Sequence, residues 1–158
     1  MKIINIKADK MRYQKNSSAY SLVLLSLITG MIGLFILINY DQFITEGNLN
    51  MRIIPNLRVG VEILIGIIMM LMTFLGAEKV KLYDHKWSFY WIFVLAGINV
   101  YRIFNLPIYA EKKGWIPEQT MIIVMVAYAV TAGLLIAAGV ISARKVITLR
   151  NHMKELNT

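Results

Sequence analysis

Two ionisable residues stand inside otherwise apolar stretches, and their types and spacing suggest an ion pair. Glu62 lies in the stretch 59–77, and Arg102 lies in the stretch 87–105. An ionisable side chain within a membrane span costs about 2.5–3.5 kcal/mol on insertion scales, so such groups usually face a partner or the interior of a helix bundle. A short loop joins the two stretches, so we expect them to form a tight antiparallel hairpin in which each residue stands about 22 Å from the loop, at about 1.5 Å per helical residue. We therefore expect the two side chains to meet at matching depth.

Two asparagines extend this pair into a polar cluster. Asn99 and Asn105 each stand three residues from Arg102, a spacing that makes side chains neighbours on a helix surface. The cluster of Glu62, Asn99, Arg102 and Asn105 has three interpretations. In the first, a salt bridge fixes the register of the helices. In the second, the charged side chains extend to the outer headgroups. In the third, the cluster contacts an ion, a lipid headgroup or a substrate. Below the cluster the stretches are almost wholly apolar, which argues against a water-filled pore in a single chain.

A pattern of small residues marks the stretch 120–143. Ala129, Gly133 and Ala137 recur every four residues, and this spacing places them on one face of a helix. Small residues on a shared face let two helices approach closely in lipid. The face either packs inside the bundle or binds another chain, and the sequence leaves both alternatives open.

The sequence lacks the usual patterns of catalytic and metal sites. It contains no Cys and only two His, His85 and His152, which are far apart in the chain. No H-E-x-x-H, G-x-S-x-G or Gly-rich phosphate loop occurs. Asp84 precedes His85, but an acid beside a His in a loop is ordinary. No span contains a pair of carboxylates for acid–base chemistry, so we expect no enzymatic activity, no cofactor and no metal site.

Four long apolar stretches must position these residues. They cover about 21–40, 59–77, 87–105 and 120–143 in a chain of 158 residues that is 58% hydrophobic, with a mean hydropathy of +0.59. About 20 apolar residues cross a hydrocarbon core about 30 Å thick, and a chain in lipid must satisfy its backbone within helices. We therefore expect an all-α polytopic membrane protein with a four-helix transmembrane domain over 19–143.

The basic residues predict the orientation of these spans. Twelve Lys and Arg fall in the N-terminal arm 1–18, the loop after the second span and the tail 144–158, whereas four fall in the other two loops. The positive-inside rule then places both termini in the cytoplasm, with the protein in the cell membrane. This distribution and the anionic cytoplasmic leaflet explain the net charge of +8 without a nucleic-acid partner.

Two segments outside the spans have open roles. The tail 144–158 is expected to continue the last span as a basic helix, which either docks onto a partner or only sets the topology. The outer loop 41–58 is expected to be a plain loop, with an interfacial position or a cover over the bundle as the alternative.

These features predict a non-catalytic subunit or accessory protein of a bacterial-type membrane assembly, such as a transport complex. Its partners would be the lipid bilayer and other membrane subunits or a second copy of itself. The prediction rests on the missing catalytic set, the small-residue face and the basic ends. The alternative is a small transporter or channel that forms its pathway by homo-oligomerising.

Overall fold

The computed structural model describes residues 10–11, 13–43, 57–112 and 116–157. Most of the predicted arm 1–18 and of the loop 41–58 lies outside these residues. The described helices are α2 (Ser17–Phe43), α3 (Leu57–Lys81), the short π-helix η1 (Trp87–Trp91), α4 (Ile92–Lys112) and α5 (Glu118–Asn157). The four spans formed by α2, α3, η1 with α4, and α5 are long and apolar enough to cross a membrane. The all-α, four-span fold predicted from the sequence is therefore confirmed.

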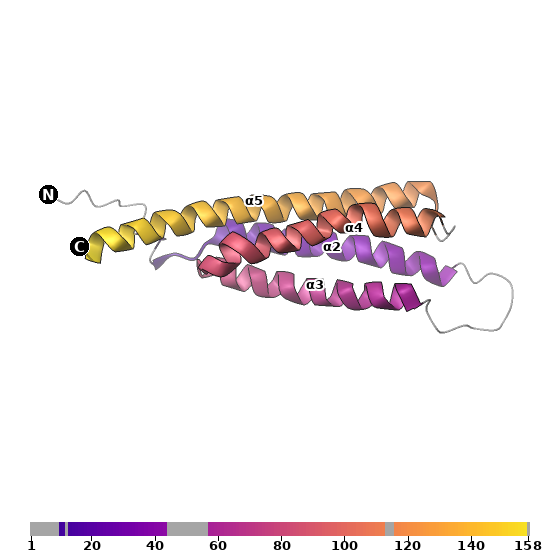
Figure 1. Ribbon diagram of the computed structural model, residues 1–158, viewed down its shortest axis with the longest axis horizontal. Coiled ribbons are helices and arrows are strands. Elements are labelled where there is room, and N and C mark those ends of the chain that lie inside the picture. Colours follow the sequence, from indigo (N-terminus) through magenta and orange to yellow (C-terminus); the bar gives the residue numbers. More distant parts are fainter. Residues whose placement is uncertain (1–9, 12, 44–56, 113–115, 158) are drawn as a thin grey trace.

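The four long helices lie side by side in one elongated bundle (Figure 1). α5 packs along both α2 and α4, and α3 packs mainly along α2. The tight hairpin expected for the second and third spans is wrong, because contacts between α3 and α4 are few even though a short turn joins them. The order around the bundle is therefore α3, α2, α5, α4, and the side between α3 and α4 is the most loosely packed.

Glycines explain the close packing of α5. A Cβ placed on Gly33 of α2 would lie 3.4 Å from the Tyr128 ring, and one placed on Gly139 of α5 would lie 2.8 Å from Phe93 of α4. Without side chains at these positions, the helices approach closely enough for dispersion contacts along their length. Chain adjacency alone would have paired α3 with α4 instead.

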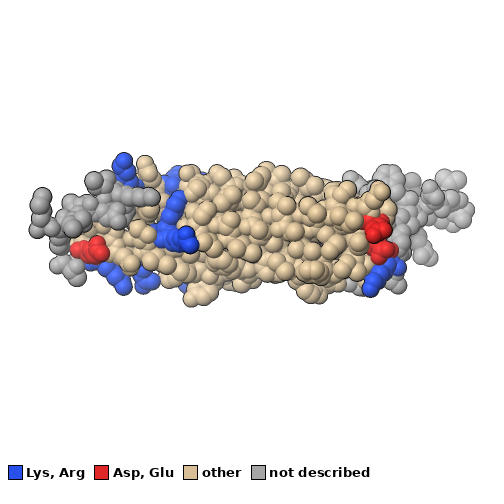
Figure 2. Space-filling model, turned by 90° about the horizontal axis from the view of Figure 1, so that it is seen from above, with Lys and Arg blue, Asp and Glu red and all other residues tan. Residues whose placement is uncertain are grey.

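Lys and Arg side chains gather towards one end of the bundle, which we call the basic end (Figure 2). At this end α2 begins, α3 ends and α5 projects beyond the other helices (Figure 1). α5 has 40 residues, which is about 60 Å at the rise of an α-helix, or about twice the hydrocarbon thickness. The helix predicted to continue past Ala143 therefore does so, and it extends to Asn157.

α4 is longer than the predicted span. The apolar stretch was expected to end near Asn105, but the helix continues through Pro107 to Lys112. Proline normally stops a helix because it lacks an N–H and crowds the preceding turn. Membrane helices tolerate it because neighbouring groups satisfy the freed backbone.

The turn between α3 and η1 is tight and locally stabilised. Tyr83 adopts a left-handed backbone conformation with φ of 58°. The Asp84 carboxylate accepts a hydrogen bond of 3.0 Å from the backbone N–H of Trp87, which caps the start of the next helix. His85 packs edge-on against Phe89, with ring centres 4.5 Å apart. Asp84 and His85 thus each make a contact that stabilises the turn.

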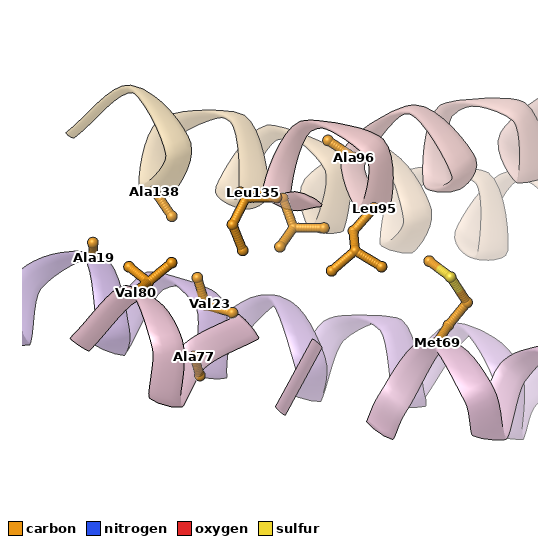
Figure 3. Close-up of a cluster of buried hydrophobic side chains, with 10 residues drawn as sticks. Ala19, Val23, Met69, Ala77, Val80, Leu95, Ala96, Leu135 and Ala138 are labelled. Atoms are coloured by element: carbon orange, nitrogen blue, oxygen red, sulfur yellow. The ribbon is translucent and has the colours of Figure 1, made fainter. Parts of the chain in front are cut away.

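An apolar layer fills the bundle towards the basic end (Figure 3). All four helices contribute to it, and Val23 and Leu135 are entirely buried within it. Small residues such as Ala77 and Ala138 alternate with these larger ones. The full set is Ala19, Val23, Met69, Ala77, Val80, Ile92, Leu95, Ala96, Leu135 and Ala138.

Candidate functional site

Glu62 and Arg102 face each other across the loosely packed side between α3 and α4. Arg102 Nη2 lies 3.9 Å from Glu62 Oε2, and the two side chains are 7% and 18% exposed. The structure thus brings the two predicted partners together. The separation exceeds the roughly 2.7–2.9 Å of a charge-assisted hydrogen bond. Glu62 Oε2 and the Nε and Nη2 atoms of Arg102 are buried and meet no hydrogen-bond partner among the described residues.

Tyr128 of α5 completes the surroundings of the guanidinium. Arg102 Cζ lies 4.7 Å from the centre of the Tyr128 ring, within the range of a cation–π interaction. Tyr128 is fully buried, and its hydroxyl also meets no hydrogen-bond partner in the described part of the chain. The sequence analysis missed Tyr128. The only available signal was an aromatic residue with a polar tip between small residues in the stretch 120–143.

Arg102 and Asn99 line a pocket at the centre of the bundle. Its volume is about 20 Å³, enough for one water molecule or a group of similar size. All four helices line it, and its polar side chains are Ser26, Thr73, Asn99, Arg102 and Thr131. Of the four residues in the predicted cluster, Asn99 and Arg102 thus line the pocket, and Glu62 contacts Arg102 beside it.

Asn105 lies elsewhere. It does not contribute to the pocket lining, and its side-chain amide donates a hydrogen bond of 2.7 Å to the Tyr101 hydroxyl on the exposed side of α4. The predicted cluster therefore divides, because Asn99 and Asn105 are displaced around the helix by about 60° in opposite directions from Arg102 at 3.6 residues per turn.

The pocket hydroxyls donate their protons to their own helices. Ser26 donates to the Val23 carbonyl at 2.7 Å, and Thr73 donates to the Met69 carbonyl at 2.7 Å. Thr131 Oγ1 lies 2.8 Å from the Ala127 carbonyl and also 2.8 Å from Thr29 Oγ1 on α2. Such bonds to a carbonyl three or four residues back let Ser and Thr sit inside an apolar helix. They also explain why the sequence analysis missed these residues.

A second polar layer closes the bundle at the basic end. The side-chain amide of Asn16 donates to Ser142 Oγ at 3.2 Å, and Ser142 Oγ lies 2.7 Å from Ser88 Oγ. Lys145 Nζ donates to Asn16 Oδ1 at 2.9 Å. Along each helix, residues of the apolar layer lie between this network and the central pocket. Within the described residues, these two polar layers are therefore not continuous with each other.

The small-residue pattern of α5 faces outwards. Ala129, Gly133 and Ala137 are all exposed, and a Cβ placed on Gly133 would meet no atom within 4 Å. The opposite side of α5 carries the buried Leu135 and Ala138. Of the two alternatives left by the sequence, packing inside the bundle is therefore wrong for this face.

The same face continues into the projecting part of α5. Val140, Arg144 and Ile147 follow Gly133 and Ala137 at alternating spacings of three and four residues, and all are exposed. A repeat of this kind keeps side chains aligned with a second helix in a coiled coil. We call these five residues, together with Ala129, the outer face of α5.

Comparison of the chain with protein-family models, curated proteins and solved structures finds no match. In the described ranges, no three His, Cys, Asp or Glu side chains gather in a way that would hold a metal ion. The polar pocket and the outer face of α5 are therefore the two features of the chain that bear on its function.

Proposed function

We propose that the chain is a non-catalytic subunit of a larger membrane assembly and that the outer face of α5 binds a helix of another subunit. The observation that carries this proposal is the open surface at Gly133, where no side chain of the bundle covers the helix. Lipid chains are as apolar as the helix surface, so association there depends on close packing, which small residues permit.

Charge and symmetry favour a different subunit over a second copy. Two copies inserted in the same direction would align their outer faces in parallel around a twofold axis, so that each residue meets its counterpart. Arg144 would then face Arg144, and like charges in such an alignment repel. A partner helix with acidic side chains at this level would instead pair with Arg144 and cover the exposed Ile147.

In the proposed orientation the protein lies in the cell membrane, either a plasma or an inner membrane, and its basic end lies in the cytoplasm. Reporter domains fused after Thr158 or inserted between Leu82 and Lys86 are expected to read as cytoplasmic. Reporters inserted in the 41–58 loop are expected to read as external, because the positive-inside rule orients the spans. The reverse pattern would contradict this orientation.

The subunit proposal is tested by filling the outer face. Gly133→Leu places a bulky side chain where a partner helix would approach and is expected to release the partner during purification in mild detergent. Gly97→Leu is the matched control, because Gly97 is likewise exposed, with no atom within 4 Å of its Cβ position, but lies on α4. Loss of the complex in both variants, or its retention in Gly133→Leu, would contradict the proposal.

The second candidate is a small transporter that forms its pathway as a homo-oligomer. The central pocket favours it, because ionisable groups inside spans often mark substrate or ion pathways. Passage through one chain would require the apolar layer around Val23 and Leu135 to open. Purification from the native host distinguishes the two: foreign subunits in a fixed ratio favour the subunit, and a homo-oligomer alone favours the transporter.

A further inference from the structure

Arg102, which lines the central pocket, has a guanidinium edge without a hydrogen-bond partner in the described residues. Nε and Nη2 are buried and meet no acceptor in the described residues, while the side chain as a whole is 7% exposed. These two nitrogens lie on the same edge of the planar guanidinium, the arrangement that binds the two oxygens of a carboxylate or phosphate through parallel hydrogen bonds. Leaving two such donors unpaired in a buried site is costly.

We propose that this edge binds an oxyanion group, either a carboxylate or a phosphate. The pocket volume of about 20 Å³ has room for about one oxygen atom of such a group and excludes a large ligand body. This site is independent of the proposed partner helix, because the pocket lies at the centre of the bundle and the outer face of α5 lies on its surface.

Glu62 balances the charge of Arg102 but makes no hydrogen bond to this edge. Its Oε2 atom lies 3.9 Å from Nη2 and makes no hydrogen bond in the described part of the chain. Glu62 also lies outside the pocket lining. Repulsion between this carboxylate and a bound oxyanion opposes binding, so Glu62 lowers the affinity of the site for the ligand.

The other pocket residues suit an oxygen-rich ligand with a proton to donate. The hydroxyls of Ser26 and Thr73 donate to backbone carbonyls, so their oxygen lone pairs remain as acceptors. The Asn99 amide donates to the Leu95 carbonyl at 2.9 Å, which leaves its side-chain oxygen as a further acceptor. A protonated oxygen of the bound group would donate to one of these acceptors.

The ligand could come from a lipid headgroup or from solution, and thermal unfolding of the purified full chain distinguishes these sources. The probes are sodium formate, inorganic phosphate and phosphatidylglycerol, each titrated into delipidated protein in mild detergent. We expect a saturable rise of the unfolding midpoint, because a ligand that binds only the folded protein stabilises it. A rise with formate or phosphate identifies a soluble ligand, and a rise with phosphatidylglycerol alone identifies a lipid.

Three variants make the test specific. Arg102→Lys keeps the charge but loses the two-nitrogen edge and is expected to weaken binding about tenfold or more. Glu62→Gln removes the opposing carboxylate and is expected to strengthen it. Asn105→Ala, on the same helix but outside the pocket lining, is expected to leave binding unchanged. No midpoint shift with any probe in either the natural protein or Glu62→Gln, or equal shifts in Arg102→Lys, would overturn the proposal.

Discussion

Glu62→Gln and Arg102→Gln are each expected to lower the thermal stability of the protein, and the double variant is expected to lose less than the sum. Removing one partner of a fully buried ion pair costs about 3–5 kcal/mol, because the other charge remains in an apolar setting. Here the cost is expected to be smaller, since the Glu62 side chain is 18% exposed. Unfolding midpoints of the four proteins in one detergent give the coupling energy of the pair.

Two outcomes of this cycle would contradict the pairing or its role. Strict additivity would mean that the two charges do not interact in the folded protein. Single variants that remain stable but fail in the host would mean that the pair serves function and not helix register. Arg102→Gln is expected to cost more than Glu62→Gln, because it also removes the cation from the Tyr128 ring, an interaction worth about 0.5–2 kcal/mol.

Leu135→Ala is expected to destabilise the bundle by about 2–5 kcal/mol, the range seen when a large buried side chain leaves a cavity. Leu135 is fully buried in the apolar layer between the two polar layers. Its neighbour Ile136 is 44% exposed on the surface of α5, so Ile136→Ala is the matched control. Lipid fills the space left there, and we expect a change below about 1 kcal/mol.

The same thermal unfolding assay compares Leu135→Ala with Ile136→Ala. A loss in Leu135→Ala that is no larger than the loss in Ile136→Ala would contradict the packing of α5 against α2 and α4. A large loss in both would mean that the surface of α5 around Ile136 is covered even in the purified protein.

The sequence predicted the elements of this fold well because lipid imposes simple rules on helices. Long apolar runs gave four helical spans, and the uninterrupted stretch after Ala143 gave the projecting helix of α5. The ends of the helices were predicted less accurately, because α4 continues through Pro107 to Lys112. The packing order was not predictable from chain adjacency, since it depends on close approaches at Gly33 and Gly139.

The candidate site was predictable only in part. Matching depth along two helices predicted the contact of Glu62 with Arg102, and helical spacing added Asn99 to the site. Spacing alone could not show that Asn105 turns away, because that depends on which side of α4 faces the bundle. Ser26 and Thr131 line the pocket only because α2 and α5 pack around a shared centre, and the sequence alone did not show that packing.

The most direct test of the proposed subunit role uses cysteine as a reporter of contact in native membranes. The natural chain contains no Cys, so Gly133→Cys carries a single thiol that accepts a photoreactive cross-linker. We expect one adduct with a different membrane protein, the same adduct from Ile147→Cys on the same face of α5, and none from Gly97→Cys on α4. Adducts of Gly133→Cys with a second copy of this chain alone, or no protein adduct at all, would contradict a subunit held through this face.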